Sequence, residues 1–176
     1  MNSQTKVLNP MRQPRIGKVV VNISVGKSGE QLTRAMTVLE QLTGQKPCQR
    51  LAKKSVREWG IRKNEPIACI VTLRHEKAME FLRKSLDAVV NKLSISSFDN
   101  NGNFSFGLKE HIEIYGVRYD PALGIFGMDV SVVVERPGYR VKRKRIRRAQ
   151  IGRRHRLKPE EAMEYVKETF GTEILE

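Results

Sequence analysis

Hydrophobic and polar positions follow two different periods in the first part of this chain. Between Ile16 and Val25, apolar side chains recur at every second position, which is typical of a β-strand with one buried face. Residues 30–43 instead place leucine and methionine three or four positions apart, which predicts an amphipathic helix that stops at Gly44. Residues 67–74 are rich in β-branched side chains and predict a second strand.

Predicted strands and helices continue to follow one another along the rest of the chain. A second amphipathic helix is predicted from Glu76 to about Leu93. Hydrophobic residues show no regular spacing over residues 94–107, which predicts a loop. The remaining predicted elements are strands at 111–117 and 128–135 and a final helix over 159–170. This order favours an α+β fold, a mainly antiparallel sheet with helices packed on one face. The other face is then left for a partner.

Charge is distributed less evenly than hydropathy. The chain has 33 Lys and Arg against 19 Asp and Glu, a net charge of +14. Residues 136–158 hold 12 cations and no carboxylate, and residues 46–63 hold seven cations and one glutamate, whereas the rest of the chain is mildly acidic. A tract as dense as 136–158 repels itself unless a polyanion lies beside it, so a nucleic acid is the favoured partner.

Length and composition exclude several other classes of protein. No apolar run approaches the roughly 20 residues of a membrane span, and no leucine or aromatic stripe accompanies the cations to enter a membrane surface. Residues 1–15 are polar, which predicts an extended arm without a signal peptide. Two cysteines cannot form a disulfide framework. We therefore expect a protein of a reducing, cytoplasmic compartment that contacts no membrane.

Catalytic and metal-binding patterns are missing from the sequence. Cys48 and Cys69 lie 21 positions apart and the three histidines are scattered, so no zinc-ligand spacing occurs. Cys69 falls in an apolar run and is predicted to be a small core residue. No nucleophile and base can be paired by spacing. We predict a protein that is not an enzyme and has neither metal nor cofactor.

Two polar or aromatic positions leave alternatives open. Trp59, the only tryptophan, lies among cations and could stack on a nucleobase or anchor its loop to the protein. Asn22 lies on an apolar strand and could be a buried, satisfied amide or an RNA contact on the open sheet face. Two rival functions also remain: a general DNA-compacting protein and a nucleic-acid-modifying enzyme. The second would need a cluster of metal ligands or bases.

Blocks of sequence in a fixed order point to one family. They include Val21-Asn22-Ile23-Ser24-Val25-Gly26, Gly44-Gln45-Lys46-Pro47, Gly60-Ile61-Arg62-Lys63, Tyr119-Asp120-Pro121 and Arg136-Pro137-Gly138-Tyr139. From about residue 9 to 170, the chain resembles the large-subunit ribosomal protein L-five family in its archaeal and eukaryotic branch. The density of Lys and Arg at 142–148 exceeds what is typical of that family.

The resemblance implies a structural constituent of the large ribosomal subunit, with residues 1–176 forming a single domain that binds 5S ribosomal RNA. It implies attachment of that RNA in the central protuberance, beside 23S-type ribosomal RNA and the large-subunit protein eighteen family. It also implies that a protruding basic loop, residues 46–66, contacts transfer RNA in the peptidyl site. A further surface would bridge to the small-subunit protein thirteen family.

Individual contacts follow from the resemblance and from the charge. The polar residues that match the 5S-facing sheet of the family are Asn22, Gln45 and Thr72. The cations expected to hold ribosomal RNA are Arg12, Arg15, Arg143, Arg145, Arg147, Arg148, Arg153 and Arg154. The residues expected to contact transfer RNA are Lys53, Lys54, Ser55, Arg57, Arg62 and Lys63.

Overall fold

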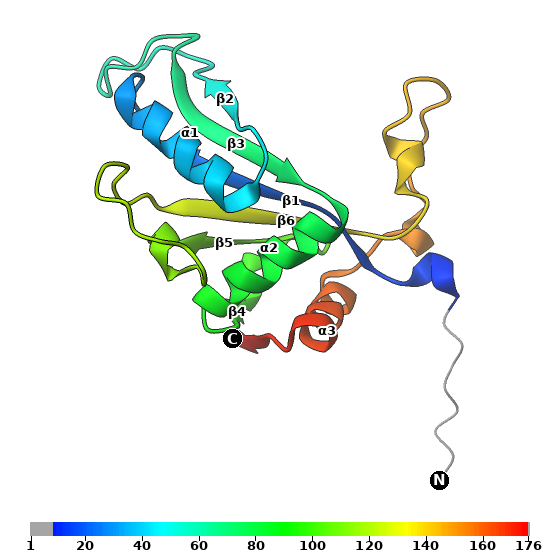
Figure 1. The fold of residues 1–176 in the computed structure, drawn as a ribbon. Coiled ribbons are helices and arrows are strands. Elements are labelled where there is room, and N and C mark those ends of the chain that lie inside the picture. Colours follow the sequence, from blue (N-terminus) through cyan, green and yellow to red (C-terminus); the bar gives the residue numbers. More distant parts are fainter. Residues whose placement is uncertain (1–8, 176) are drawn as a thin grey trace.

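A five-stranded antiparallel sheet forms the centre of the protein in a computed structural model that describes residues 9–175 (Figure 1). Its strands, in the order β2-β3-β1-β6-β5, are Cys48–Leu51, Pro66–Leu73, Arg15–Ser24, Met128–Glu135 and Phe104–Leu108. The helices are α1 (Glu30–Thr43), α2 (His75–Ala88) and α3 (Pro159–Phe170). A separate parallel pair joins β4 (Lys92–Ser94) to β7 (Glu173–Leu175). The α+β fold with a mainly antiparallel sheet is confirmed.

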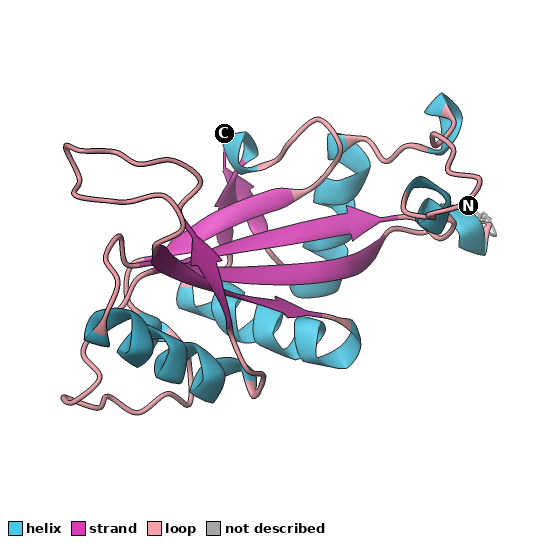
Figure 2. Ribbon diagram, turned by 90° about the horizontal axis from the view of Figure 1, so that it is seen from above, coloured by secondary structure: helices cyan, strands magenta, loops and turns pink. Residues whose placement is uncertain are grey.

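Helices cover one face of the sheet because alternate strand residues are apolar. On β1, Val19, Val21 and Ile23 are at most 1% exposed. α2 packs on β1 and α1 packs on β3, so the apolar sides of both helices meet these side chains. Figure 2 shows two helices, α1 and α2, running along one side of the strands. The hydrophobic core therefore lies between the sheet and this helical layer.

The opposite face of the sheet is not covered by a helix. Strand register places Asn22 beside Ile70 of β3 and Asp129 of β6, all with side chains on this second face. Its exposed positions include Cys48, Arg50, Thr72, Ser105, Asp129 and Ser131. We call this surface the open face. It is mostly polar, as expected for a surface that meets water or a polar partner.

The second helix is shorter than its apolar pattern predicts. α2 ends at Ala88, and Val90 and Asn91 adopt φ values of +57° and +53°, outside the right-handed helical region. Val90, expected on the buried side of a helix reaching Leu93, is 72% exposed. Leu93 remains buried, but it reaches the core from β4. The prediction of a helix to Leu93 is thus wrong over its last turn.

Three other local predictions differ from the structure. Residues 111–117 do not form a strand; a 3₁₀ turn at His111–Glu113 leads into a loop instead. The predicted loop over 94–107 contains most of β5, which pairs with β6. The basic segment 46–66 contains β2, an edge strand whose four residues are all exposed. Strands this short depend on a neighbouring strand for their hydrogen bonds, and a one-dimensional pattern does not show that neighbour.

Only part of the predicted N-terminal arm can be compared, since residues 1–8 lie outside the described residues. Pro10–Arg12 form a 3₁₀ turn, and the end of the Met11 side chain lies close to Gly138. The arm therefore lies beside the start of the basic tract, which we define as residues 136–158. Between residues 9 and 175, no helix has the length and apolar character needed to span a membrane.

Candidate nucleic-acid interface

Asn22 lies at the centre of the open face. Its Nδ2 donates to Ser24 Oγ at 2.9 Å and approaches Asp129 Oδ2 at 3.5 Å. Its Oδ1 accepts no hydrogen bond from residues 9–175, and the residue is only half-buried. A core amide would have all its groups satisfied. The geometry therefore favours the second alternative, an amide that presents an acceptor to a partner on the open face.

Thr72 and Gln45 lie towards the same end of β3. Thr72 is exposed and pairs with Val20 of β1, diagonally adjacent to Asn22. Gln45 is half-buried and precedes β2, whose first residue pairs with Ile70. Because β2 and β3 are antiparallel, the chain before β2 runs alongside the Thr72 end of β3. The three polar residues suggested by the family resemblance thus belong to one region of the molecule.

The base of the basic tract is built around a buried arginine. Arg136, with a side chain 8% exposed, donates from Nη2 to Glu161 Oε2 of α3 at 2.8 Å. Its Nη1 approaches the carbonyl oxygens of His155 and Arg156 at 3.5 and 3.4 Å. A buried guanidinium needs such partners because desolvation of an unpaired charge is costly. Arg136 is therefore part of the scaffold and does not lie on the binding surface.

Tyr139 joins the two ends of the tract. Its hydroxyl accepts from the Leu157 amide at 2.9 Å and donates to the His155 carbonyl at 3.3 Å. The His155 ring contacts the Pro137 carbonyl through Nε2 at 2.9 Å. These bonds bring residues 137–139 and 155–157 together, so the cationic residues between them project as a loop from one end of the sheet (Figure 1).

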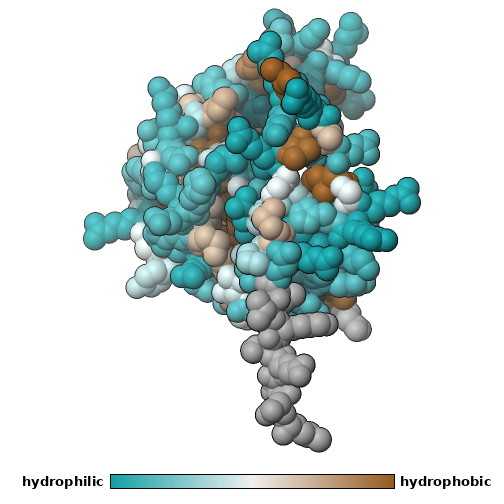
Figure 3. All heavy atoms as spheres, turned by 90° about the vertical axis from the view of Figure 1, so that its right-hand side faces the viewer, coloured by the Kyte–Doolittle hydropathy of each residue, from teal (hydrophilic) through white to brown (hydrophobic). Residues whose placement is uncertain are grey.

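The projecting part of the tract is exposed and has few carboxylate partners. Every residue from 142 to 150 is exposed. Arg143 Nη2 contacts both oxygens of Glu135, at 2.9 and 3.0 Å, and Arg15 lies 3.9 Å from the same carboxylate. Among residues 9–175, only Arg136 and Arg143 of the tract's cations form ion pairs. Figure 3 shows that this side of the protein is largely hydrophilic.

The predicted ribosomal-RNA cations do not all have the same environment. Arg143 and Arg15 flank the buried carboxylate of Glu135, which fixes them at the root of the tract. The cations that are exposed and not ion-paired within residues 9–175 are Arg12, Arg145, Arg147, Arg148, Arg153 and Arg154. The second group is available for phosphate contacts without breaking an internal pair.

An open cleft of about 830 Å³ connects the tract to the open face. Its walls include Lys18 of β1, Asn101 and Asn103 of the loop before β5, and Arg148 and Arg156 of the tract. Sequence reasoning missed these two asparagines and Lys18, because only the folded chain brings them next to residues more than 40 positions away. A concave surface lined by cations and amides suits a phosphate-sugar backbone.

The predicted basic loop is an ordered extension of the β2–β3 pair. The Ala52 amide donates to the Glu65 carbonyl at 2.8 Å, and Val56 and Ile61 exchange backbone hydrogen bonds of 2.9 and 3.1 Å. Ser55 Oγ accepts from the Lys63 amide at 2.9 Å. We call residues 52–65 the basic hairpin. Ser55, predicted to contact transfer RNA, thus also stabilises the hairpin itself.

The cations of the basic hairpin point into solvent without ion pairs. The exposed cations are Lys53, Lys54, Arg57, Arg62 and Lys63, and none forms a salt bridge within the described part of the chain. The carboxylate of Glu65 accepts from Ser28 Oγ at 2.5 Å and from the Arg62 amide at 2.9 Å. These two hydrogen bonds lower the pKa of Glu65. Glu65 is thus occupied by uncharged donors.

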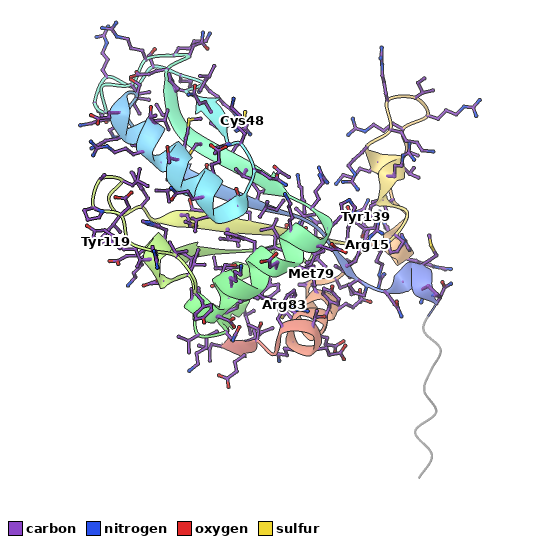
Figure 4. All side chains as sticks on the ribbon, viewed as in Figure 1. Arg15, Cys48, Met79, Arg83, Tyr119 and Tyr139 are labelled. Atoms are coloured by element: carbon purple, nitrogen blue, oxygen red, sulfur yellow. The ribbon has the colours of Figure 1, made fainter. Side chains whose placement is uncertain are left out.

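The two cationic surfaces lie at opposite ends of the sheet. β1 begins at Arg15, paired with Glu135 where the tract starts, and ends at Ser24, paired with Ala68 beside the root of the hairpin. Ten residues of strand span roughly 33 Å. Figure 4 shows Arg15 and Tyr139 at one end of the molecule, and the loop between β2 and β3, labelled in Figure 1, lies at the other end. Two separate stretches of nucleic acid could therefore be contacted at once.

The two cysteines have different environments in the structure. Cys69 is fully buried on β3, which confirms its prediction as a core residue, and burial raises the pKa of its thiol to about 11. Cys48 is exposed on the open face. Residues 9–175 contain no group of three His, Cys, Asp or Glu side chains placed to hold a metal ion.

Comparison with known proteins identifies the family. Residues 9–62 match the model for ribosomal protein L5, and residues 66–170 match the model for the C-terminus of the same ribosomal family. The large ribosomal subunit protein uL5 of Aeropyrum pernix is 57% identical over 164 residues, covering 93% of this chain and 85% of that protein. The protein of the same name from Sulfurisphaera tokodaii is 51% identical over 99% of both chains, and that from Methanosphaera stadtmanae is 48% identical over 95% of this chain and 99% of its own. These matches show that the chain is a structural ribosomal protein, not an enzyme, and that it belongs to the ribosomal protein L5 family.

Proposed function

We propose that this protein is a constituent of the large ribosomal subunit and that residues 1–176 act there as one domain that binds 5S ribosomal RNA. The names of its relatives support the first part of this proposal. The observation that carries the second part is the continuous surface formed by the open face, the 830 Å³ cleft and the basic tract. Nearly all of its charged groups are cations.

Arginines and uncharged polar side chains would make different contacts with the RNA on this surface. Exposed arginines of the tract, such as Arg145 and Arg148, neutralise phosphates and supply most of the affinity. Asn22, Thr72 and Gln45 supply hydrogen bonds to base edges and to ribose hydroxyls. The ribose 2′-hydroxyl is the group that distinguishes RNA from DNA. Asn22 is suited to this role because its Oδ1 remains without a partner among the described residues.

The same proposal assigns the remaining partners by position. The tract would hold 5S ribosomal RNA against 23S-type ribosomal RNA in the central protuberance, next to the large-subunit protein eighteen family. The basic hairpin, at the other end of the sheet, would contact transfer RNA in the peptidyl site. A contact with the small-subunit protein thirteen family would complete a bridge between subunits. Support for these finer assignments comes from the family and from the separation of the two surfaces.

A binding assay with purified protein and 5S RNA tests the central claim. If six to ten phosphates are engaged, affinity should fall by roughly 10³ to 10⁵ between 50 and 200 mM salt. The double variant Asn22→Ala with Thr72→Ala should bind 5S RNA about tenfold more weakly, because it loses hydrogen bonds worth on the order of 1 kcal/mol or more. Thr37→Ala, on the exposed side of α1, is the matched control and should bind normally.

Alkylation of Cys48 gives an independent measure of which face binds. Cys48 is exposed on the open face, whereas the Cys69 thiol is buried and protonated at neutral pH. Bound 5S RNA should protect Cys48 from a thiol reagent, with loss of protection in the Asn22/Thr72 variant. Equal affinity for random duplex DNA and 5S RNA would contradict the proposal and favour the general DNA-compacting protein.

A further inference from the structure

The apex of the basic hairpin carries an aromatic side chain whose role is open. We propose that Trp59 stacks on an unpaired nucleobase of the RNA that the hairpin contacts. The inference rests on the proposed role of the hairpin as an RNA-contacting element. It adds a recognition mode, because the neighbouring cations are attracted mainly to phosphates, whereas an indole ring stacks only on a base that is unpaired and accessible.

Backbone hydrogen bonds fix the position of Trp59. The Val56–Ile61 pair closes the hairpin, and the Gly60 amide donates to the Arg57 carbonyl at 3.1 Å. Residues 57–60 therefore form a four-residue turn with Trp59 at its third position. Gly60 has a φ of +67°, a conformation that a glycine adopts without strain. The indole is thus attached to an ordered turn, and little backbone entropy is lost when it meets a ligand.

Trp59 does not anchor the hairpin to the rest of the protein. It is 70% exposed, and it belongs to neither the buried core nor the partly buried side chains packed against it. The hairpin is held instead by its own backbone pairs and by the Glu65 contacts with Ser28 and Arg62. The alternative in which Trp59 anchors its loop is therefore not supported by the described residues.

The charges around Trp59 favour a nucleobase over an apolar protein surface or a membrane. Five exposed cations surround it in the hairpin, against one unpaired carboxylate, that of Glu58, within the described part of the chain. Such a surface attracts a polyanion and places an aromatic face beside the phosphates it has attracted. An interleaved aromatic and cationic surface is the arrangement used to bind unpaired nucleic acid, because every base offers a face for stacking. A membrane-inserting tip would need several large apolar residues.

Fluorescence tests the proposal directly, since Trp59 is the only tryptophan in the chain and its emission reports on the hairpin apex alone. Full-length protein is titrated with deacylated transfer RNA, which has unpaired loop bases, and with a fully paired RNA duplex of equal length. Stacking should quench the emission with transfer RNA and leave it nearly unchanged with the duplex. A blue shift without quenching would mean burial against an apolar surface and would overturn the proposal.

Substitution gives the second measurement. Trp59→Leu should weaken binding of transfer RNA between about five-fold and 150-fold, the range expected for one stacked base, and Trp59→Phe should retain part of the affinity. Tyr115→Leu is the control, an aromatic that is 86% exposed outside the hairpin, and should have no effect. Unchanged binding by Trp59→Leu would overturn the inference.

A cation variant separates this inference from the proposed function of the hairpin. Lys53→Ala with Lys54→Ala and Arg57→Ala removes phosphate contacts but keeps the indole. If this triple variant loses transfer-RNA binding and Trp59→Leu does not, only the stacking role fails. If neither change affects binding, the hairpin is not an RNA-contacting element and the proposed function fails with it.

Discussion

His111 is one of the few polar side chains inside the protein, at 3% exposure. Its Nδ1 accepts from the Phe126 amide at 3.3 Å, and its own amide donates to the Phe126 carbonyl at 3.0 Å. These two bonds close the loop between residues 111 and 126. Because Nδ1 acts as an acceptor, the ring is neutral with its proton on Nε2. Burial lowers the pKa of His111.

The lowered pKa predicts a loss of stability in mild acid. A histidine that is neutral in the folded state binds fewer protons than it does when unfolded, so the free energy of unfolding falls as pH drops below about 6.5. His111→Gln keeps an acceptor but does not titrate, and should show a smaller decrease between pH 7 and pH 5. Urea unfolding of both proteins at several pH values measures the difference. Parallel pH profiles would contradict this role for His111.

At the level of elements, the tract depends on α3 for its position. Glu161 Oε2 accepts from Arg136 Nη2 at 2.8 Å and from the Lys158 amide at 3.2 Å. One carboxylate therefore caps the first turn of α3 and neutralises the buried guanidinium at the start of the tract. Glutamates 160 and 161 both fit the sequence pattern of a helix start, but only the structure distinguishes this role of Glu161.

Removal of the shared carboxylate should destabilise the protein. Glu161→Ala leaves Arg136 buried without its anion and should lower the free energy of unfolding by about 2–4 kcal/mol; the lower end allows for the partial exposure of Glu161. Glu160→Ala, exposed in the same turn, loses only the interaction with the helix dipole, about 0.3–1 kcal/mol. Chemical denaturation measures both. Equal losses would mean that the Arg136 pair is unimportant.

At the scale of the whole molecule, the separation of the two cationic surfaces matters most. The body of the chain is mildly acidic, so the net charge of +14 comes from the basic hairpin with its flanks and from the tract. The sheet holds these surfaces at opposite ends of β1. This separation supports the proposed function, in which one end of the sheet holds an assembled RNA and the other contacts an exchangeable one.

Matched triple variants test this division. Lys53→Ala, Lys54→Ala and Arg57→Ala together should reduce retention of transfer RNA at the peptidyl site and spare 5S RNA binding. Arg145→Ala, Arg147→Ala and Arg148→Ala together should weaken 5S RNA binding and reduce its salt slope by about 0.9 per lost phosphate contact. Ribosome-binding and filter-binding assays measure the two effects. Equal losses of both activities by either variant would show that the surfaces do not work separately.

The sequence by itself determined the elements that have strong local signals. Strand β1, helix α1 and the N-terminus of α3 follow from side-chain period and from the residues at helix ends, which act over a few positions. The basic tract and the basic hairpin are visible as charge runs, because a cluster of cations needs no folding to be recognised. The local pattern singled out Asn22 as a polar side chain on an apolar strand, and the family resemblance added Gln45 and Thr72.

Only the tertiary structure decided which residues share a surface. The short strands β2 and β5 exist because β3 and β6 satisfy their hydrogen bonds, and alternation at 111–117 finds no partner strand and becomes a turn. The cleft brings Lys18 and Asn101 to the tract, and strand register determines the open face. Register and packing join residues far apart in the chain, so a local pattern cannot contain them.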